Sequence, residues 1–394
     1  IKLYSRLIGE YPYHKFALVE NFLQTGYGMP SFTLLGSKVI RLPFIPYTSY
    51  PHEVLHNWWG NSVYVDYASG NWSEGLTTYL ADHLLKQQRD GGSDYRRDAL
   101  QRYADYVSTE KDIALSQFRA RHSKASQAIG YSKAMMLFHM VRLAMGDRQF
   151  VEGLRKFYQQ NRFKVAGYEQ LLQAFEQSTD VRLRLMFEQW LERAGLPALE
   201  VTRVDIKRMQ NDYELELELR QKQDGDAFTL MVPVFIQTDA GRQPLRKLVQ
   251  MDGKQQLYRF RTSTRPVRIA IDPQYDTLRR LHPDEIPASL AQVFAAENTL
   301  IVLPSLERAD LRAAYTALAD SWSRGGGIEV VMDDTINDLP QGRMVWIFGR
   351  SNRFAKSLLA ELSDGQFIVN PESLNVSGHD YGMKNHSFAV TARQ

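Results

Sequence analysis

Two histidines and a glutamate in the stretch from Pro51 to Gly60 have types and a spacing that can do chemistry. His52, Glu53 and His56 form an H-E-x-x-H motif. On a helix, residues four apart lie on the same face, so both imidazoles can point at one metal ion. Zn²⁺ suits two imidazole ligands, and Glu53 would stand beside it to accept a proton from water. Two histidines packed in a buried helix would give the same motif. The residues around the motif must therefore distinguish a metal site from a packed helix.

A catalytic zinc site of this kind needs a third protein ligand and leaves the fourth position to water. In one class of zinc peptidases the third ligand is a histidine six residues after the second, and a glycine lies three residues before it. Trp59 and Ser62 occupy those two positions, which excludes that class. Another class supplies a glutamate from the next helix. Within residues 57–81 only Asp66 and Glu74 are acidic. We expect Glu74 to be the third ligand and Asp66 to be a solvated loop residue.

The residues around these ligands resemble those of a known family. The runs HEVLHNWWGN at 52–61 and WSEG at 72–75 are similar to those of the aminopeptidase N group of gluzincin zinc peptidases. The gap between the second histidine and the glutamate is one residue shorter than is usual in that group, which a loop deletion explains. The resemblance is specific here and extends more loosely over residues 15–275. It implies a thermolysin-like, mostly helical catalytic domain that holds one Zn²⁺ per chain.

The resemblance also implies where the substrate binds. In the family, a Gly-Ala-Met-Glu-Asn segment on an edge strand pairs its backbone with the substrate, and its Glu binds the free amino terminus. Here the corresponding residues are GYGMP at 26–30, which we predict to be a turn or bulge between strands at 15–22 and 31–35. Gly28 and Met29 are therefore the predicted substrate-binding residues.

This segment departs from the family at the position that determines aminopeptidase specificity. Pro30 takes the place of the glutamate and offers neither a carboxylate nor an N–H group. Proline is acceptable on an edge strand, so the fold is not in doubt. Glu20 is an alternative anchor for the amino group, although an isolated strand glutamate more often faces solvent. Exopeptidase and endopeptidase action both stay open.

Tyr131 is the predicted fifth member of the site. It lies in the run AIGYSKAM at 128–135, which opens an apolar helix reaching Met145. A tyrosine buried in a core would fit this run equally well. In the family, however, a tyrosine before a Lys-Gly/Ala pair lies across the zinc from the glutamate base, where it can donate a hydrogen bond to the developing oxyanion. We expect Lys133 to be a structural or surface residue.

The periodicity of the chain predicts a multidomain α+β protein. One helix is expected to start at Ser49 and Pro51 and to carry the H-E-x-x-H motif, and another is expected over 73–88. Residues 94–118 and 122–195 then have strong helical periodicity. Strict alternation at 213–219 then marks a strand with one buried face. Further short strands predict a small β-sandwich, which the family also places after its catalytic domain. The expected strands are Tyr213–Leu219, Phe228–Gln237, Arg246–Met251, Gln256–Arg261 and Val267–Ile271.

A Pro-rich and acidic linker is expected from Asp272 to Ala288, followed by a small α/β domain of unknown role. Its expected elements are strands at 300–303, 328–331 and 344–348 and a helix at 306–323. The predicted domains are 1–195 for the catalytic domain, 196–285 for the β-sandwich and 295–394 for the α/β domain. The run GRSN at 349–352 follows a strand; a plain turn is favoured there over an anion site.

Composition excludes several classes of protein. The net charge of +3 is too small to indicate a nucleic-acid partner, and no apolar run is long enough for a membrane span. The chain has no cysteine, so disulfides and cysteine-bound zinc are excluded. It begins with Ile1 rather than methionine, which favours a processed chain. The compartment stays open between cytoplasm and cell envelope, with a lean towards an exported protein, and the oligomeric state is unknown.

We therefore expect zinc-dependent hydrolysis of peptide bonds in a peptide or protein substrate. His52, His56 and Glu74 would hold the metal, Glu53 would act as the base and Tyr131 would stabilise the oxyanion. Three alternatives stay open: an endopeptidase, a hydrolase of a substrate that is not a peptide, and a non-catalytic scaffold that binds a partner. A scaffold has no need to keep all five residues, which argues against it.

Overall fold

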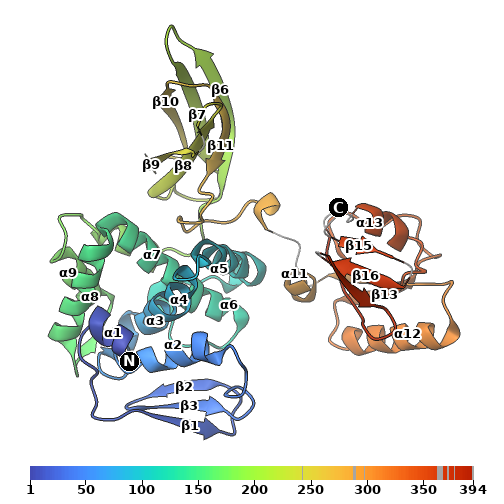
Figure 1. Ribbon diagram of the computed structural model, residues 1–394, viewed down its shortest axis with the longest axis horizontal. Helices are drawn as coiled ribbons and strands as arrows, with labels where there is room; N and C mark the ends of the chain where they lie inside the picture. Colours follow the sequence, from blue (N-terminus) through green and yellow to red (C-terminus); the bar gives the residue numbers. More distant parts are fainter. Residues whose placement is uncertain are drawn as a thin grey trace. The chain divides into compact units, whose positions relative to one another are not determined.

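The structure is a computed structural model that describes residues 1–241, 243–286, 290–296, 298–361, 367–370, 372–376 and 378–392. The chain forms two compact units, Ile1–Glu285 and Ile286–Gln394. The helical and strand-rich parts of the first 285 residues therefore belong to one unit. Figure 1 shows the elements of each unit. Among the described residues, no helix combines the length and the apolar character needed to cross a bilayer.

The first unit opens with helix α1 (Lys2–Leu7) and a three-stranded sheet in the order β1-β3-β2. Strand β1 (Ala17–Asn21) pairs in parallel with β3 (Phe32–Gly36), and β2 (Gly26–Met29) pairs with β3 in the antiparallel direction. The prediction of a turn or bulge at Gly26–Met29 is wrong. The turn comes after it, where Ser31 has a φ of 69°.

Helices make up most of the next 145 residues, from α2 to α10 (Figure 1). They are α2 (Ser49–Leu55), α3 (Trp72–Thr78), α4 (Leu84–Gln87), α5 (Gly92–Tyr106), α6 (Lys124–Gln127), α7 (Ala134–Met145), α8 (Asp147–Asn161), α9 (Tyr168–Glu176) and α10 (Arg184–Glu192). Two π-helical segments, Tyr79–His83 (η3) and Ala128–Lys133 (η6), join α3 to α4 and α6 to α7. A two-stranded parallel ribbon links β4 (Tyr64–Val65) to β5 (Val165–Ala166).

Two helical predictions need correction. The helix expected over 94–118 ends at Tyr106, and the following residues form short 3₁₀ turns at Thr109–Lys111 and Leu115–Gln117. The Tyr103 hydroxyl donates to Asp112, which also accepts from the backbone N–H of Gly195, so side chains bend this segment against the end of the helical part. The helical periodicity over 122–195 belongs to several separate helices, with Gly146 and Gly167 at two of the breaks. The helix predicted to open at Ala128 becomes α-helical only at Ala134, after a π-helical segment.

Aromatic side chains fill the core between these helices. Trp58, Trp59 and Trp72 are completely buried. The Trp58 indole donates to the carbonyl of Gly9, and the Trp59 ring packs edge-on against Trp72 at 6.1 Å. Full burial leaves Trp58 and Trp59 no surface for stacking on a substrate, so they anchor the H-E-x-x-H helix to its neighbours.

The strand-rich part of the first unit contains two three-stranded antiparallel sheets. One has the order β10-β7-β6 and the other β11-β8-β9. The strands are β6 (Leu199–Arg208), β7 (Tyr213–Gln221), β8 (Leu230–Thr238), β9 (Leu245–Met251), β10 (Gln255–Thr262) and β11 (Pro266–Ile271). The leucines at 215, 217 and 219 of β7 are buried, as are Val232, Val234 and Ile236 of β8, which is expected for the inner faces of a sandwich. Strand β6 was not predicted because most of its side chains are exposed and it lacks a clean alternation.

The segment after β11 is not the linker that its composition predicts. Asp272, Asp276 and Arg279 are all buried, and Leu278 is 1% exposed. Asp272 pairs with Arg279 at 3.0 Å and also accepts the backbone N–H of Asp276 at 2.7 Å. Satisfied buried charges of this kind belong to a packed interior. The end of the predicted linker, residues 287–288, lies outside the described residues.

The second unit contains a parallel sheet in the order β13-β12-β14. Its elements are α11 (Leu290–Ala295), β12 (Thr299–Leu303), α12 (Ala309–Ser323), β13 (Ile328–Met332), β14 (Met344–Ile347) and α13 (Ala355–Glu361). An antiparallel sheet of β15 (Phe367–Val369), β16 (Ser373–Val376) and β17 (His379–Gly382) follows and was not predicted. At the predicted turn, the Asn352 amide donates to the carbonyl of Val302 and its oxygen accepts from Phe354.

Candidate metal and catalytic site

Helix α2 places the two histidines one turn apart. Pro51 lies in its first turn, where a missing N–H group costs nothing. His52 lies within the helix and His56 at its C-cap, and their ring centroids are 4.9 Å apart. Both side chains are largely buried, with 11% and 12% of their surface exposed. The helix thus directs two imidazoles into one small space.

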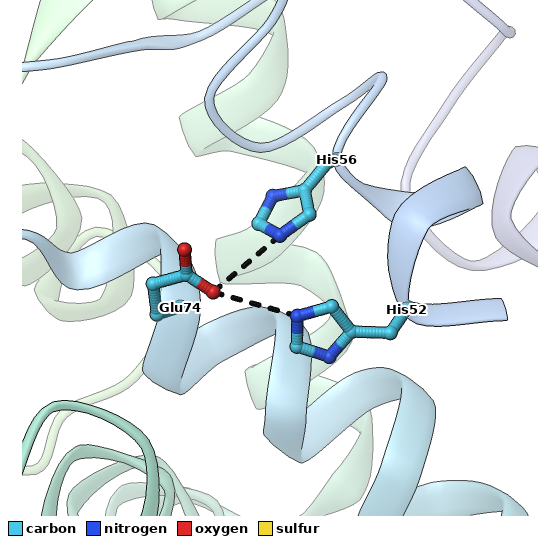
Figure 2. A group of neighbouring side chains, drawn as sticks. All are labelled: His52, His56 and Glu74. Carbon is cyan, nitrogen blue, oxygen red and sulfur yellow. Dashed lines mark hydrogen bonds and ion pairs between the residues drawn. The ribbon is translucent and has the colours of Figure 1, made fainter. Parts of the chain in front are cut away.

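Helix α3 brings Glu74 into that space, as Figure 2 shows. The Asn71 side chain caps this helix by accepting the N–H of Ser73. Glu74 Oε2 lies 3.4 Å from His52 Nε2 and 3.5 Å from His56 Nε2. One ligand atom from each of the three residues lies within 4.8 Å of the others.

These separations can be compared with those that a zinc ion requires. Ligand atoms bound about 2.0–2.1 Å from a tetrahedral ion lie about 3.4 Å from one another. The two distances from Glu74 Oε2 to the imidazole nitrogens match this value. Two nitrogens and one carboxylate oxygen are also a donor set that zinc prefers in catalytic sites. The geometry and the chemistry of His52, His56 and Glu74 therefore fit a zinc ion.

The remaining ring nitrogen of each histidine has its own partner. His52 Nδ1 lies 2.7 Å from Asp82 Oδ2, and His56 Nδ1 lies 3.0 Å from the carbonyl oxygen of Trp59. Each Nδ1–H donates, which leaves Nε2 free to bind a metal and holds the ring in place. Asp82 was not predicted. Its only sequence signal is a carboxylate on the same helical stretch as Glu74, and the two are eight residues apart.

Glu53 lies on α2 beside the two histidines, and β2 crosses close to it. A Cβ atom on Gly26 would lie 2.5 Å from Glu53 Oε1, so only glycine allows the strand to approach the carboxylate. Burial raises the pKa of Glu53 above its ordinary value, although the His56 and His52 imidazoles oppose this shift. A carboxylate whose pKa is raised is a stronger base and therefore a better proton acceptor.

Tyr131 lies on the π-helical segment η6, and its ring stacks on His52. The ring centroids are 6.2 Å apart and the planes meet at 13°. Burial, followed by the Glu74 carboxylate, raises the pKa of Tyr131 well above its usual value. The phenol is therefore neutral and can donate a hydrogen bond. Lys133 is fully buried and donates from Nζ to the Arg193 carbonyl at 2.8 Å, so its role is structural and the surface interpretation is wrong.

Strand β2 forms the wall of the site opposite α3. A Cβ atom on Gly28 would lie 2.5 Å from His56 Cβ, so this glycine also allows the strand to approach α2. The carbonyl of Gly28 accepts a hydrogen bond from Asn61 Nδ2 at 2.9 Å. This carbonyl therefore points away from β3. Met29 completes the strand, and β2 pairs with β3 on one side only among the described strands.

Two other acidic residues lie outside this arrangement. Glu20 belongs to β1, at the other edge of the sheet, where it is exposed and pairs with Arg41 at 3.1 Å. Asp66 caps the short turn η2 (Tyr67–Ser69) by accepting the N–H of Ala68. Glu20 is thus a solvent-facing strand residue, and Asp66 has a local structural role.

The sequence and the fold are similar to those of known peptidases. Residues 49–190 match the Peptidase family M1 domain. This match and the relatives below support an aminopeptidase N-like gluzincin family for the matched region. Aminopeptidase RNPEPL1 of Mus musculus is 26% identical over 218 residues, which are 50% of this chain and 30% of the mouse protein. Aminopeptidase N of Lactococcus lactis subsp. lactis is 23% identical over 163 residues, or 39% of this chain and 19% of that protein.

A solved structure has a related fold. It is a crystal structure of Legionella pneumophila aminopeptidase A in complex with aspartic acid. The two share a TM-score of 0.53 and 18% sequence identity over 75% of this chain and 35% of the other. The matches thus cover about a third or less of the length of these relatives. The family match therefore concerns residues 49–190, and the solved structure shows a related fold.

Proposed function

We propose that this protein hydrolyses peptide bonds as a zinc peptidase of the aminopeptidase type. The observation that carries the proposal is the separation of 3.4 and 3.5 Å between Glu74 and the two imidazole nitrogens. These distances match the donor spacing of a tetrahedral zinc ion. We propose one zinc per chain, held by His52, His56 and Glu74, and a peptide or protein as the substrate.

The side chains around the three ligands would carry out the proton transfers. A zinc ion bound there would supply Lewis-acid polarisation and lower the pKa of a water molecule in the site. Glu53 accepts a proton from that water and later donates it to the leaving amine, so the residue ends each turnover as a carboxylate. Burial raises the pKa of Glu53 above its ordinary value, which makes the carboxylate a stronger base for the first transfer.

Tyr131 and β2 complete the mechanism. The Tyr131 hydroxyl donates a hydrogen bond to the substrate carbonyl oxygen as negative charge develops on it. The edge of β2 at Gly28 and Met29 aligns the substrate backbone by adding it as a strand. Strand addition uses only backbone groups, so the glycines of β2 can take part in it although they have no side chains.

One observation favours a second candidate, endopeptidase action. Glu20 is the only acidic residue in 15–36, and it lies at the far edge of the sheet. Pro30 therefore leaves the strand side without a carboxylate to bind a free amino terminus. The relatives that the comparisons name are aminopeptidases, which is why aminopeptidase action stands first.

Three domains are proposed for the chain. Residues 1–195 would be the thermolysin-like catalytic domain, 196–285 a β-sandwich and 295–394 an α/β domain of unassigned role. The first two pack in one compact unit and the third lies in the other.

Fluorogenic peptides test this proposal. Two matched peptides, one with a free and one with an acetylated amino terminus, are incubated with the full chain, with a chelator, and with chelator followed by added zinc. Cleavage of the free peptide that the chelator stops and zinc restores would support the aminopeptidase. Equal cleavage of the acetylated peptide at an internal bond would support the endopeptidase. Cleavage of neither peptide by a zinc-loaded chain would contradict both and favour a scaffold.

A further inference from the structure

The helical stretch from α3 through α4 carries two carboxylates that must face the same helix. Glu74 reaches the Nε2 atoms of both histidines, and Asp82 reaches Nδ1 of His52. The two carboxylates are eight residues apart. At about 100° per residue, eight residues of regular α-helix would turn the second side chain about 80° away from the first. A regular helix would therefore not direct both carboxylates at α2.

The π-helical segment η3 (Tyr79–His83) removes this mismatch. The N–H of Leu84 bonds to the carbonyl of Tyr79, five residues earlier. Such a wide turn accommodates one extra residue, so the effective spacing falls towards seven residues and the two side chains come close to alignment. π turns are rare and less favourable than α turns. Something in the surroundings must hold this one.

Two side chains of the same segment point to a buried polar cluster. The rings of Tyr79 and His83 stack at a centroid distance of 5.0 Å and an angle of 17°. Both are buried, at 1% and 0% exposure. Neither is a ligand of the candidate metal site. They lie among side chains of α5, α7 and the segment after β11, which form the cluster described next.

The cluster is a series of hydrogen bonds that runs through Tyr79, His139, Asp276, Arg96 and His83, and the stacked rings of Tyr79 and His83 complete it. We call this cluster the polar ring. Arg96 donates to His83 Nε2 at 2.9 Å and to Asp276 Oδ1 at 3.0 Å. His139 Nε2 donates to the same carboxylate oxygen at 3.1 Å. The Tyr79 hydroxyl donates to His139 Nδ1 at 3.3 Å. The series begins and ends on the π-helical segment.

The protonation states of the two histidines agree with these bonds. Burial lowers the pKa of His83 to about 2, with the neighbouring His139 adding to the effect. Burial likewise lowers the pKa of His139 to about 4, although Asp276 opposes this shift. Both rings are therefore neutral at neutral pH, and each has one nitrogen that accepts. The only charges in the ring are the paired Arg96 and Asp276.

The polar ring joins the π-helical segment to the strand-rich part of the unit. Arg96 also donates to the backbone carbonyls of Gln274 and Tyr275, at 2.8 and 3.1 Å. Arg246, on β9, pairs with the other oxygen of Asp276 at 3.2 Å. The ring is thus tied to the chain that follows the sandwich, which gives the wide turn a rigid support outside its own helix.

We propose that Arg96 and Asp276 are positioning residues for the metal site. Through Tyr79 and His83 they hold the π-helical turn, and the turn keeps Asp82 on His52 while Glu74 stays on the metal side. This inference rests on the proposed function, because it assumes that the site binds zinc. Carboxylates that orient a metal-binding histidine contribute about 10–100-fold to metal affinity.

The dissociation constant for zinc tests this proposal without any substrate. It is measured by competition with a chelator for the full chain and for Asp82→Asn, Arg96→Gln, their double mutant and Tyr79→Phe. We expect Asp82→Asn to weaken zinc binding about 10–100-fold and Arg96→Gln about tenfold. Tyr79→Phe, which removes one hydroxyl, should weaken it about threefold. The double mutant should bind about as weakly as Asp82→Asn alone, because both changes act through the same contact.

Tyr103→Phe is the matched control. It removes a buried hydroxyl from the same helix, α5, and that hydroxyl donates to Asp112 rather than to a residue of η3. Zinc affinity within about twofold of wild type is expected there. Unchanged affinity in folded Arg96→Gln and Tyr79→Phe, or effects that multiply in the double mutant, would overturn the inference. If Arg96→Gln does not fold, the zinc affinity of Tyr79→Phe alone tests the inference, and an unchanged affinity overturns it. A wild-type chain that binds no zinc would overturn the proposed function, and this inference with it.

Discussion

The two walls of the candidate site differ in what they offer. The helical wall of α2 and the stretch 72–87 carries imidazoles and carboxylates, and both ring nitrogens of His52 and of His56 have a partner. The strand wall, β2, offers backbone groups, two glycines and the side chains of Tyr27 and Met29, without a carboxylate. The chemistry is therefore built on rigid helices, whereas substrate selection is left to a strand whose family carboxylate is replaced by Pro30. The mechanism should be more sensitive to changes in the helical wall.

The largest expected effect comes from the helical wall. Glu53→Gln should lower kcat about 10²–10⁴-fold, because the amide cannot accept the proton of the water. Zinc content should stay unchanged, since Glu53 is not a ligand. Steady-state kinetics with elemental analysis measures both. Glu20→Gln, an exposed glutamate of the same sheet region, is the control and should be fully active. An active, zinc-loaded Glu53→Gln would remove this residue from the base role.

A second substitution in the helical wall should have a smaller effect on kcat. Tyr131→Phe removes only the hydroxyl and should lower kcat about 10²–10³-fold, with KM nearly unchanged, because the hydrogen bond strengthens in the transition state. Stopped or continuous peptide assays give both constants. Tyr67→Phe, at an exposed position, serves as the control. A rise in KM at constant kcat would instead make Tyr131 a residue that binds the ground state.

A change in the strand wall should act through position rather than chemistry. Gly28→Val places a side chain against His56 and should push β2 away from α2, at a cost of about 1–3 kcal/mol in the free energy of unfolding. KM should rise more than kcat falls. Denaturant unfolding and peptide kinetics measure these effects. Gly253→Ala is the control, because a Cβ there meets only a backbone oxygen at 3.6 Å. Normal KM and stability in Gly28→Val would show that β2 does not border the substrate.

The smallest expected effect would restore what the strand wall lacks. Pro30→Glu adds a carboxylate at the end of β2 and should lower KM for a free-amine peptide by about threefold to tenfold, since a charge-assisted hydrogen bond at an exposed position is worth about 1 kcal/mol. KM for the acetylated peptide should not change. Equal effects on both peptides would mean that this position does not lie near the amino end of the substrate.

The same contrast explains how much of the site the sequence could predict. His52, Glu53, His56 and Glu74 were recognisable because metal coordination requires particular residue types at particular helical spacings. Asp82 was not, because a second carboxylate eight residues after Glu74 points elsewhere on a regular helix. Its role depends on the π-helical turn, which tertiary contacts support and local sequence does not reveal. The family resemblance, rather than periodicity, directed attention to Tyr131.

The fold shows a similar limit. Strands with one buried face, such as β7, were predicted within two residues of their ends, because alternation records burial. Strand β6 is mostly exposed and leaves little pattern. The segment 272–288 is predicted to be a linker because it is rich in proline and acidic residues. Its charges are in fact paired inside the unit, where Asp276 meets Arg96 and His139. Composition cannot distinguish a solvated charge from a buried pair.

The zinc content of Glu74→Gln tests the central claim most directly. The wild-type chain and the variant would be purified in parallel, dialysed against a weak chelator and examined by elemental analysis. Two imidazoles without the carboxylate should hold zinc far more weakly, so we predict about one zinc per wild-type chain and less than about a tenth of that in the variant. Equal zinc in the two proteins would contradict the ligand set on which the mechanism depends.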